Sequence, residues 1–143
     1  MAYYNQGQFT PSNPDKYIGT YPIEYRSAWE LTLMNVFDNH PNVEQWASET
    51  IEIPYISPVD GRWHKYIPDF FVIYIDKDDN RHGEIIEVKP ASQAYEDLAK
   101  SRKDQKELIV NHAKWKYAIE WCKAQGIEFR IMTEEQIYQG ARK

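Results

Sequence analysis

Two strongly apolar segments lie close together near the middle of the chain. The first, YIPDFFVIYI at residues 66–75, is followed after a short polar turn by EIIEVK at residues 84–89. Aromatic and β-branched residues dominate both segments, which predicts two paired strands. Because side chains alternate along a strand, Glu87 and Lys89 share one face of the second strand. An acid and an amine inside a buried strand need a compensating partner.

The rest of the sequence predicts an α/β (α+β) fold with elements in the order αβββαβα. Helical spacing of apolar residues, period-two alternation and clusters of turn residues mark the successive elements. The first three strands are expected to form an antiparallel meander, with the later strand as a fourth. In chain order, we expect a helix at 24–39, strands at 50–56, 63–76 and 84–89, a long helix at 92–125 that stops at Gly126, a strand at 127–132 and a short helix capped by Thr133.

The chain has 143 residues, which is enough for one domain with a hydrophobic core. Residues 1–22 contain Pro11, Pro14 and Pro22 and show no helical or alternating period. We therefore expect an extended N-terminal arm at 1–22 and a single domain at 23–143. The five aromatic residues of the arm are unusual for a disordered tail, and packing against the domain or against a partner would explain them.

The composition argues against several classes of protein. The single cysteine, Cys122, cannot form an intramolecular disulfide, and no run of about 18 apolar residues is present for a membrane span. The net charge is −5, whereas general polyanion-binding surfaces are usually basic. Any contact with nucleic acid is therefore expected to be local. In the long helix, the apolar stripe is expected to comprise Ile109, Trp115, Ile119 and Cys122.

Asp69 opens the first of the two apolar strands and lies 18 residues before Glu87. Hairpin pairing would bring these two carboxylates to the same edge of the sheet, where one holds a proton or a cation lies between them. Mg²⁺ suits such oxygen ligands and keeps positions for water and a phosphate oxygen. Lys89 would then act on an attacking water or neutralise the phosphate. Alternatively, Glu87 and Lys89 are a solvated face or pair with each other, and Asp69 is only a strand-start acid after Pro68.

A third acid, Glu30, lies in the first helix within YRSAWEL. It follows Ser27 by three residues, which is the capping-box pattern at a helix N-terminus. If this helix packs on the sheet, Glu30 also reaches the edge that holds Asp69. Arg26 would then lie at the mouth of the site and contact a phosphate, although an ordinary exposed arginine explains it equally well.

These residues resemble the motif of the PD-(D/E)xK nucleases. That family has a restriction-endonuclease-like αβββαβ core, in which helices flank a central mixed sheet. Asp69 after proline and the run Glu87, Val88 and Lys89 match the name motif, and Glu30 matches the acid that many members supply from the first helix. The resemblance implies that Asp69, Glu87 and the Val88 carbonyl hold Mg²⁺, for which Mn²⁺ substitutes. It also implies that Glu30 contacts the ion directly or through water and that Lys89 handles the nucleophilic water.

Longer segments narrow the resemblance. YRSAWE, IPYISPVDGR, EVKP and AKWKYAIEWCKAQGIEF are similar to the TnsA-like endonucleases, and especially to the head-completion nucleases of T4-like tailed phages. The likeness runs from about residue 13 to residue 137. It implies a DNA endonuclease that processes DNA at the packaging vertex, in the host cytoplasm during assembly or in the virion, with portal, neck or other head-completion proteins as partners.

Two other functions remain open from the sequence. One is a structural head or neck protein that keeps the nuclease fold and docks to the portal through its aromatic arm. The other is a transposon-end-cleaving subunit, which normally carries a further C-terminal domain for which 143 residues leave no room. The oligomeric state is not predicted.

Basic residues cluster after the third strand, at residues 100–106, and again around Trp115. Such a patch gives salt-dependent affinity for phosphates without sequence readout. Interleaved acids make the first cluster equally consistent with a solvated helix face. We expect Lys114 to contact nucleic acid, because it also lies in the AKWK segment of the resemblance.

Overall fold

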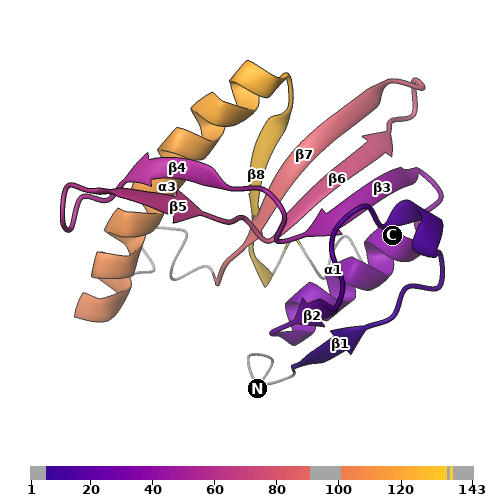
Figure 1. Ribbon diagram of the computed structural model, residues 1–143, viewed down its shortest axis with the longest axis horizontal. Helices are drawn as coiled ribbons and strands as arrows, with labels where there is room; N and C mark the ends of the chain where they lie inside the picture. The colour runs from indigo at the N-terminus through magenta and orange to yellow at the C-terminus, as the bar shows by residue number, and fades with distance from the viewer. Residues whose placement is uncertain (1–5, 91–100, 135, 137–143) are drawn as a thin grey trace.

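The central feature of the fold is a four-stranded sheet in the order β3-β6-β7-β8 (Figure 1). The computed structural model describes residues 6–90, 101–134 and 136. β6 pairs antiparallel with β3 and β7, while β8 runs parallel to β7, so the sheet is mixed, as expected. The strands are β3 (Val43–Ser48), β6 (Phe70–Ile75), β7 (Arg81–Val88) and β8 (Glu128–Met132).

The helix α3 (Arg102–Gln125) connects the two parallel strands, as a parallel pair requires a crossover. It ends where predicted: Gly126 has φ 75, and the Ile127 N–H donates to the Cys122 carbonyl at 2.9 Å. Residues 91–100, in which the helix was expected to begin, lie outside the described residues. After β8, the Thr133 N–H donates to Gln136 Oε1 at 2.8 Å, the reciprocal half of a capping box, and residues 134 and 136 are helical.

The first helix is shorter than predicted. α1 (Ala28–Asn39) begins after Ser27, whose hydroxyl accepts from the Glu30 N–H at 3.1 Å. The expected start at residue 24 is wrong because β2 (Ile23–Tyr25) precedes the helix and pairs antiparallel with β1 (Gly7–Phe9). Between these strands lies a short 3-10 turn, η2 (Pro14–Lys16).

The predicted meander is also corrected, because the long strand expected at 63–76 divides at Pro68. β5 (Trp63–Tyr66) pairs only with β4 (Ile53–Ile56) in a separate hairpin, and β6 begins the central sheet. Proline has no N–H for a ladder, so the chain changes sheets there. The third antiparallel strand of the central sheet is β3, which the sequence pattern did not predict. A register shift between Val43 and Gln45 disturbs its alternation.

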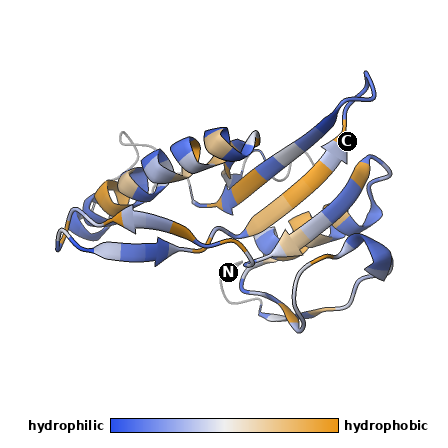
Figure 2. Cartoon of the chain, turned by 45° about the horizontal axis from the view of Figure 1, so that its top comes forward, coloured by the Kyte–Doolittle hydropathy of each residue, from blue (hydrophilic) through white to orange (hydrophobic). Residues whose placement is uncertain are grey.

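Hydrophobic stretches run along the strands of the central sheet (Figure 2), and buried hydrophobic residues pack on both of its faces. On the α1 side, Ile86 packs in one buried cluster with Phe37 and Trp46. On the α3 side, Ile85 packs with the hairpin and with Trp115. β7 is therefore enclosed between helices on both faces. In α3, Trp115 and Cys122 are buried as predicted, but Ile109 and Ile119 are 58% and 47% exposed, so that part of the predicted stripe is wrong.

The described part of the N-terminal arm packs against the domain. The rings of Phe9 and Tyr17 lie 5.8 and 4.7 Å from that of Trp46, which is fully buried. Asp38 accepts from the N–H groups of residues 12 and 13 at 2.8 and 3.1 Å, which fastens the arm to the end of α1. Tyr21 is 61% exposed. Tyr3 and Tyr4 lie outside the described residues, and the domain boundary at residue 22 stays a prediction.

Candidate active site

Asp69 and Glu87 meet where β6 begins and β7 ends. In the antiparallel register Phe70 faces Ile86, so Asp69 comes beside Glu87. The Asp69 N–H points to Glu87 Oε1 at 3.3 Å, and the Val88 N–H donates to Asp69 Oδ2 at 2.7 Å. Glu87 thus accepts from the backbone of Asp69, and Asp69 accepts from the backbone of Val88, which confirms that hairpin pairing brings the two carboxylates together.

Lys89 follows directly and anchors the end of β7. Its N–H donates to the Met132 carbonyl of β8 at 3.1 Å, and its Nζ lies 3.8 Å from Glu87 Oε2. The side chain of Glu87 is 6% exposed and that of Lys89 is 26% exposed. The two residues do pair with each other, but they are not a solvated face, because α3 and the hairpin cover this side of the sheet.

Glu30 approaches the pair from the first turn of α1. Its backbone N–H donates to Ser27, as in a capping box, and its carboxylate faces back toward the Arg26 N–H at 3.4 Å. Its charge also interacts with that of Asp69. The capping and site roles are therefore compatible. Arg26 is exposed, forms an ion pair with Glu49 at 3.2 Å, and favours the ionised form of Asp69.

Burial raises the pKa of all three acids, and repulsion by Asp69 adds to this effect for Glu30 and Glu87. Burial, followed by the charge of Asp69, raises the pKa of Glu30 to about 7. The same two causes raise the pKa of Glu87 well above its usual range, against the attraction of Lys89. Burial raises the pKa of Asp69, although the Val88 N–H opposes this. At neutral pH this site holds excess negative charge that favours a proton or a cation.

The hairpin and α3 complete the site on its far side. Tyr66, at the end of β5, is 3% exposed, and its hydroxyl is close enough to Glu87 for the carboxylate to raise its pKa, after the larger effect of burial. Lys114 of α3 lies over the rings of Tyr55 and Tyr66, 5.8 and 5.6 Å from their centroids. Burial and the nearby Lys89 lower the pKa of Lys114. The predicted nucleic-acid contact therefore borders the carboxylates.

A basic cleft of about 540 Å³ opens from Lys89 along α3. It contains four lysines and one acid, which gives the local positive charge that the overall composition lacks. Lys103 and Lys106 are both exposed, and Lys103 Nζ lies 4.0 Å from Glu107 Oε1. The lining residues are Lys89, Lys103, Lys106, Glu107, Val110, Asn111 and Lys114.

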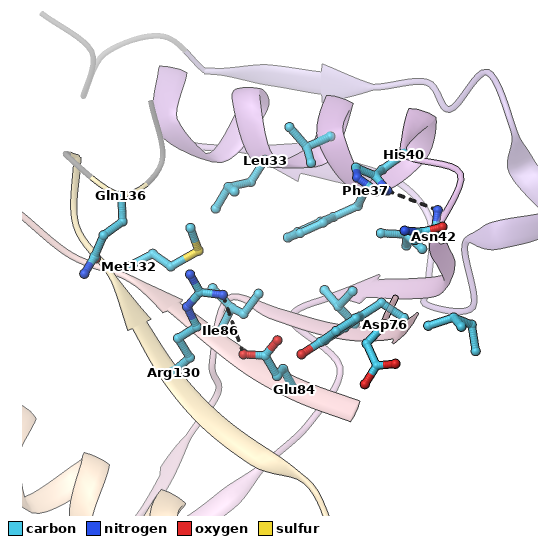
Figure 3. A pocket seen from close by; sticks show the side chains of 15 residues that line it. Leu33, Phe37, His40, Asn42, Asp76, Glu84, Ile86, Arg130, Met132 and Gln136 are labelled. Atoms are coloured by element: carbon cyan, nitrogen blue, oxygen red, sulfur yellow. Dashed lines mark hydrogen bonds and ion pairs between the residues drawn. The ribbon is translucent and has the colours of Figure 1, made fainter. Parts of the chain in front are cut away.

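A second cavity of about 420 Å³ lies on the opposite face of the sheet, between α1 and the strands (Figure 3). Its floor includes Phe37 and Ile86, and on its rim Arg130 lies 3.8 Å from Glu84. Neither Asp69 nor Glu87 lines it. The more apolar cavity is thus separate from the acidic site.

The donor set at the acidic site fits a hard divalent cation. Within residues 6–90, 101–134 and 136, no three His, Cys, Asp or Glu side chains are grouped closely enough to hold a metal by themselves. The buried Asp69–Glu87 pair supplies two carboxylates, and the backbone at Val88 is in contact with it. Mg²⁺ is commonly bound by one or two carboxylates, with water and substrate phosphate as the other ligands. This arrangement therefore matches that mode of binding.

Comparison with known proteins identifies the family. Residues 40–134 match the model of the TnsA-like endonuclease N-terminal domain. The chain belongs to the TnsA-like endonuclease family. The matched region includes Asp69, Glu87, Lys89 and Lys114, while Glu30 precedes it. Enzymes of this family generally use divalent metals.

A curated relative is similar over almost its whole length. The Head completion nuclease of Enterobacteria phage T4 is 34% identical over 146 residues, which cover 94% of this chain and 93% of the relative. The resemblance to phage nucleases within the TnsA-like family is thereby confirmed, and so is the mixed α+β fold. Among the described residues, no helix is both long and apolar enough to span a membrane.

Sequence reasoning did not identify Tyr66 as part of the site. The residue was assigned to the same strand as Asp69, where it would be an ordinary alternating aromatic. Only the change of sheets at Pro68 turns the end of the hairpin toward Glu87. The proline was the available signal, since it interrupts a strand pattern.

Proposed function

We propose that this chain is a Mg²⁺-dependent DNA endonuclease, with Mn²⁺ able to substitute. The observation that carries the proposal is the buried Asp69–Glu87 pair, with Lys89 Nζ 3.8 Å from Glu87. Such a group is expensive to bury without a cation, because the carboxylates repel and lose their hydration. A bound metal ion needed for the reaction would offset this free-energy cost of burying two carboxylates.

In this proposal Asp69, Glu87 and the Val88 carbonyl hold the metal, and Glu30 contacts it directly or through water. A bound divalent cation polarises the scissile phosphate and lowers the pKa of the attacking water. Lys89, tethered at the end of β7, orients that water and stabilises charge on the phosphate. Without metal, burial and the charge of Asp69 raise the pKa of Glu30 to about 7, so this acid exchanges a proton near neutral pH.

The DNA backbone would follow the lysine cleft beside α3. Lys114 and Lys106 would contact phosphates on one side of the scissile bond, and Arg26 would contact the other side. Their positions around the carboxylates support this path, because the cleft begins at Lys89. These contacts provide affinity without reading the sequence.

The similarity to the T4 protein supports a role in phage head completion. The nuclease would process DNA at the packaging vertex after the head is filled, in contact with portal, neck or other head-completion proteins. It would act in the host cytoplasm during assembly and could remain in the virion. The exposed Tyr21 of the otherwise packed arm is available for such a contact.

The test is cleavage of supercoiled, linear, nicked and branched DNA with Mg²⁺, Mn²⁺ or chelator. Asp69→Asn and Lys89→Ala should each abolish cleavage without loss of the folded state, measured by circular dichroism. Lys77→Ala is the matched control, since Lys77 is exposed in the turn at the opposite end of β6. It should cleave as the wild type does.

Two results would contradict the proposal. Failure of the wild type to nick any of these DNA forms would favour the structural docking role. Undiminished cleavage by Asp69→Asn would place the catalytic centre elsewhere.

A further inference from the structure

Two buried polar groups between the hairpin and α3 have no hydrogen-bond partner among the described residues. They are the Tyr66 hydroxyl and the Trp115 indole N–H, on side chains of residues that are 3% and 5% exposed. Buried polar groups are almost always paired, so each exception needs an explanation. Both lie in the hydrophobic cluster between the hairpin and α3. Glu87 raises the pKa of Tyr66, after the larger effect of burial, which brings this cluster to the acidic site.

The Trp115 N–H, the Tyr66 hydroxyl and the Glu87 carboxylate can form a chain of hydrogen bonds in one direction only. An indole N–H can only donate, a tyrosine hydroxyl can donate and accept, and an ionised carboxylate can only accept. After the larger effect of burial, Glu87 raises the pKa of the Tyr66 hydroxyl and Trp115 lowers it, so both side chains act on this hydroxyl. A chain of donation can therefore run from the indole to the hydroxyl and from the hydroxyl to the carboxylate.

Resting on the proposed function, we infer that Tyr66 is a positioning residue for Glu87. When Glu87 is ionised, the Tyr66 hydroxyl would donate to its carboxylate, and the Trp115 N–H would donate to Tyr66 Oη. Partners of this kind orient a ligating carboxylate and strengthen its binding. The Tyr66 hydroxyl and the Trp115 N–H therefore gain their partners when Glu87 is ionised.

The ring of Tyr66 has a separate task. Its face lies 5.6 Å from Lys114 Nζ, within the range of a cation–π contact, so the ring holds the lysine at the end of the basic cleft. One residue therefore contacts both the metal-binding pair and the DNA-binding lysine, through different atoms. Substitutions can separate the two.

Tyr66→Phe removes the hydroxyl and keeps the ring. Without metal, its melting temperature should equal or exceed that of the wild type by about 2–4 °C, because an unpaired buried hydroxyl is removed. With Mn²⁺, its affinity for the ion, measured by calorimetric titration, should fall about 10–100-fold. kcat for DNA cleavage should fall by a similar factor, while DNA affinity stays unchanged. Tyr66→Leu should lose DNA affinity as well.

Tyr55→Phe is the matched control. Tyr55 also lies under Lys114, at 5.8 Å, but its hydroxyl is affected by Asp60 and not by Glu87. Its Mn²⁺ affinity and kcat should remain those of the wild type.

A melting temperature of metal-free Tyr66→Phe several degrees below the wild type would show that the hydroxyl is structural and overturn the inference. Wild-type Mn²⁺ affinity in that variant would overturn it as well. The proposed function fails by a different result, which is a wild type that binds Mn²⁺ but cleaves no DNA. In that case a loss of Mn²⁺ affinity in Tyr66→Phe would still support the positioning role.

Discussion

Glu30→Gln should make the metal-free protein more stable at pH 8 while leaving its stability at pH 5 unchanged. Glutamine has the shape and neutrality of a protonated glutamate, and its amide oxygen can still accept from the Arg26 N–H. The Ser27 hydroxyl also keeps its bond to the backbone of residue 30. The substitution therefore removes the charge and preserves the start of α1.

The sign follows from the direction of the pKa change. The pKa of Glu30 rises from 4.5 to about 7 on folding, so between these values the folded state holds a proton that the unfolded state has released. Stability due to this group is greatest below the unfolded pKa, declines as pH rises, and is lost above about 7. As pH rises through this range, the free energy of unfolding should therefore fall more for the wild type than for Glu30→Gln.

The magnitude has an upper bound. At about 1.4 kcal/mol per tenfold change in proton affinity, the rise from 4.5 to about 7 corresponds to at most about 3.4 kcal/mol. Glu30 is only partly buried, and solvent screening reduces this to about 1.5 kcal/mol. Charge at the N-terminus of a helix opposes the effect by about 0.3–1 kcal/mol. The net gain should be about 1 kcal/mol, or about 3–5 °C in melting temperature for a domain of this size.

Thermal unfolding with chelator, at pH 5, 6, 7 and 8, measures the effect. Glu24→Gln is the matched control, because Glu24 is exposed on β2 and loses the same formal charge. It should shift the melting temperature little at any pH. If Glu30→Gln is no more stable than the wild type at pH 8, or gains equally at pH 5, the claim that burial and Asp69 disfavour this charge is wrong.

Three further outcomes are expected. Lys114→Ala should weaken DNA binding several-fold and reduce the slope of log affinity against log salt by about 1. Lys116 is exposed on another face of α3, so Lys116→Ala should change neither the affinity nor the slope. Fluorescence anisotropy over a salt series measures both quantities. Asp38→Ala should lower the free energy of unfolding, measured with urea, by about 2–3 kcal/mol, because it removes the acceptor for two backbone N–H groups. It should also expose the arm to proteolysis, and resistance to protease equal to that of the wild type would contradict this. Mn²⁺ at about 100 times its dissociation constant should stabilise the wild type by about 2.7 kcal/mol, an increase that chelator reverses and Asp69→Asn abolishes.

The sequence predicted the part of the site that depends on local pairing. A short turn joins β6 and β7, so their register, and with it the meeting of Asp69 and Glu87, follows from two neighbouring apolar segments. The capping role of Ser27 was equally local. Both depend on interactions between residues close in sequence or paired across one hairpin.

The features that were missed depend on long-range placement. β3 was not predicted because its bulge breaks the period of two, so its identity as a strand is determined by pairing with β6. The exposure of Ile109 was not predicted because helical spacing does not reveal which face of α3 meets the sheet and hairpin. Tyr66 was missed for a related reason, since a change of sheets decides what its hydroxyl approaches.

Repulsion among the acidic side chains of the site lowers the stability of the metal-free protein, and the same negative charge should increase the stability gained when a cation binds. Glu30, Asp69 and Glu87 are each shifted toward the protonated form, so ion binding must displace protons, and metal affinity should rise with pH. Neutralising one acid lowers both the repulsion among the carboxylates and their attraction for the cation. Glu30→Gln should therefore be more stable than the wild type in chelator and gain less from Mn²⁺, so that the difference between them narrows or reverses as the ion saturates. Equal gains from Mn²⁺ in both proteins would mean that Glu30 neither contacts the ion nor feels its charge.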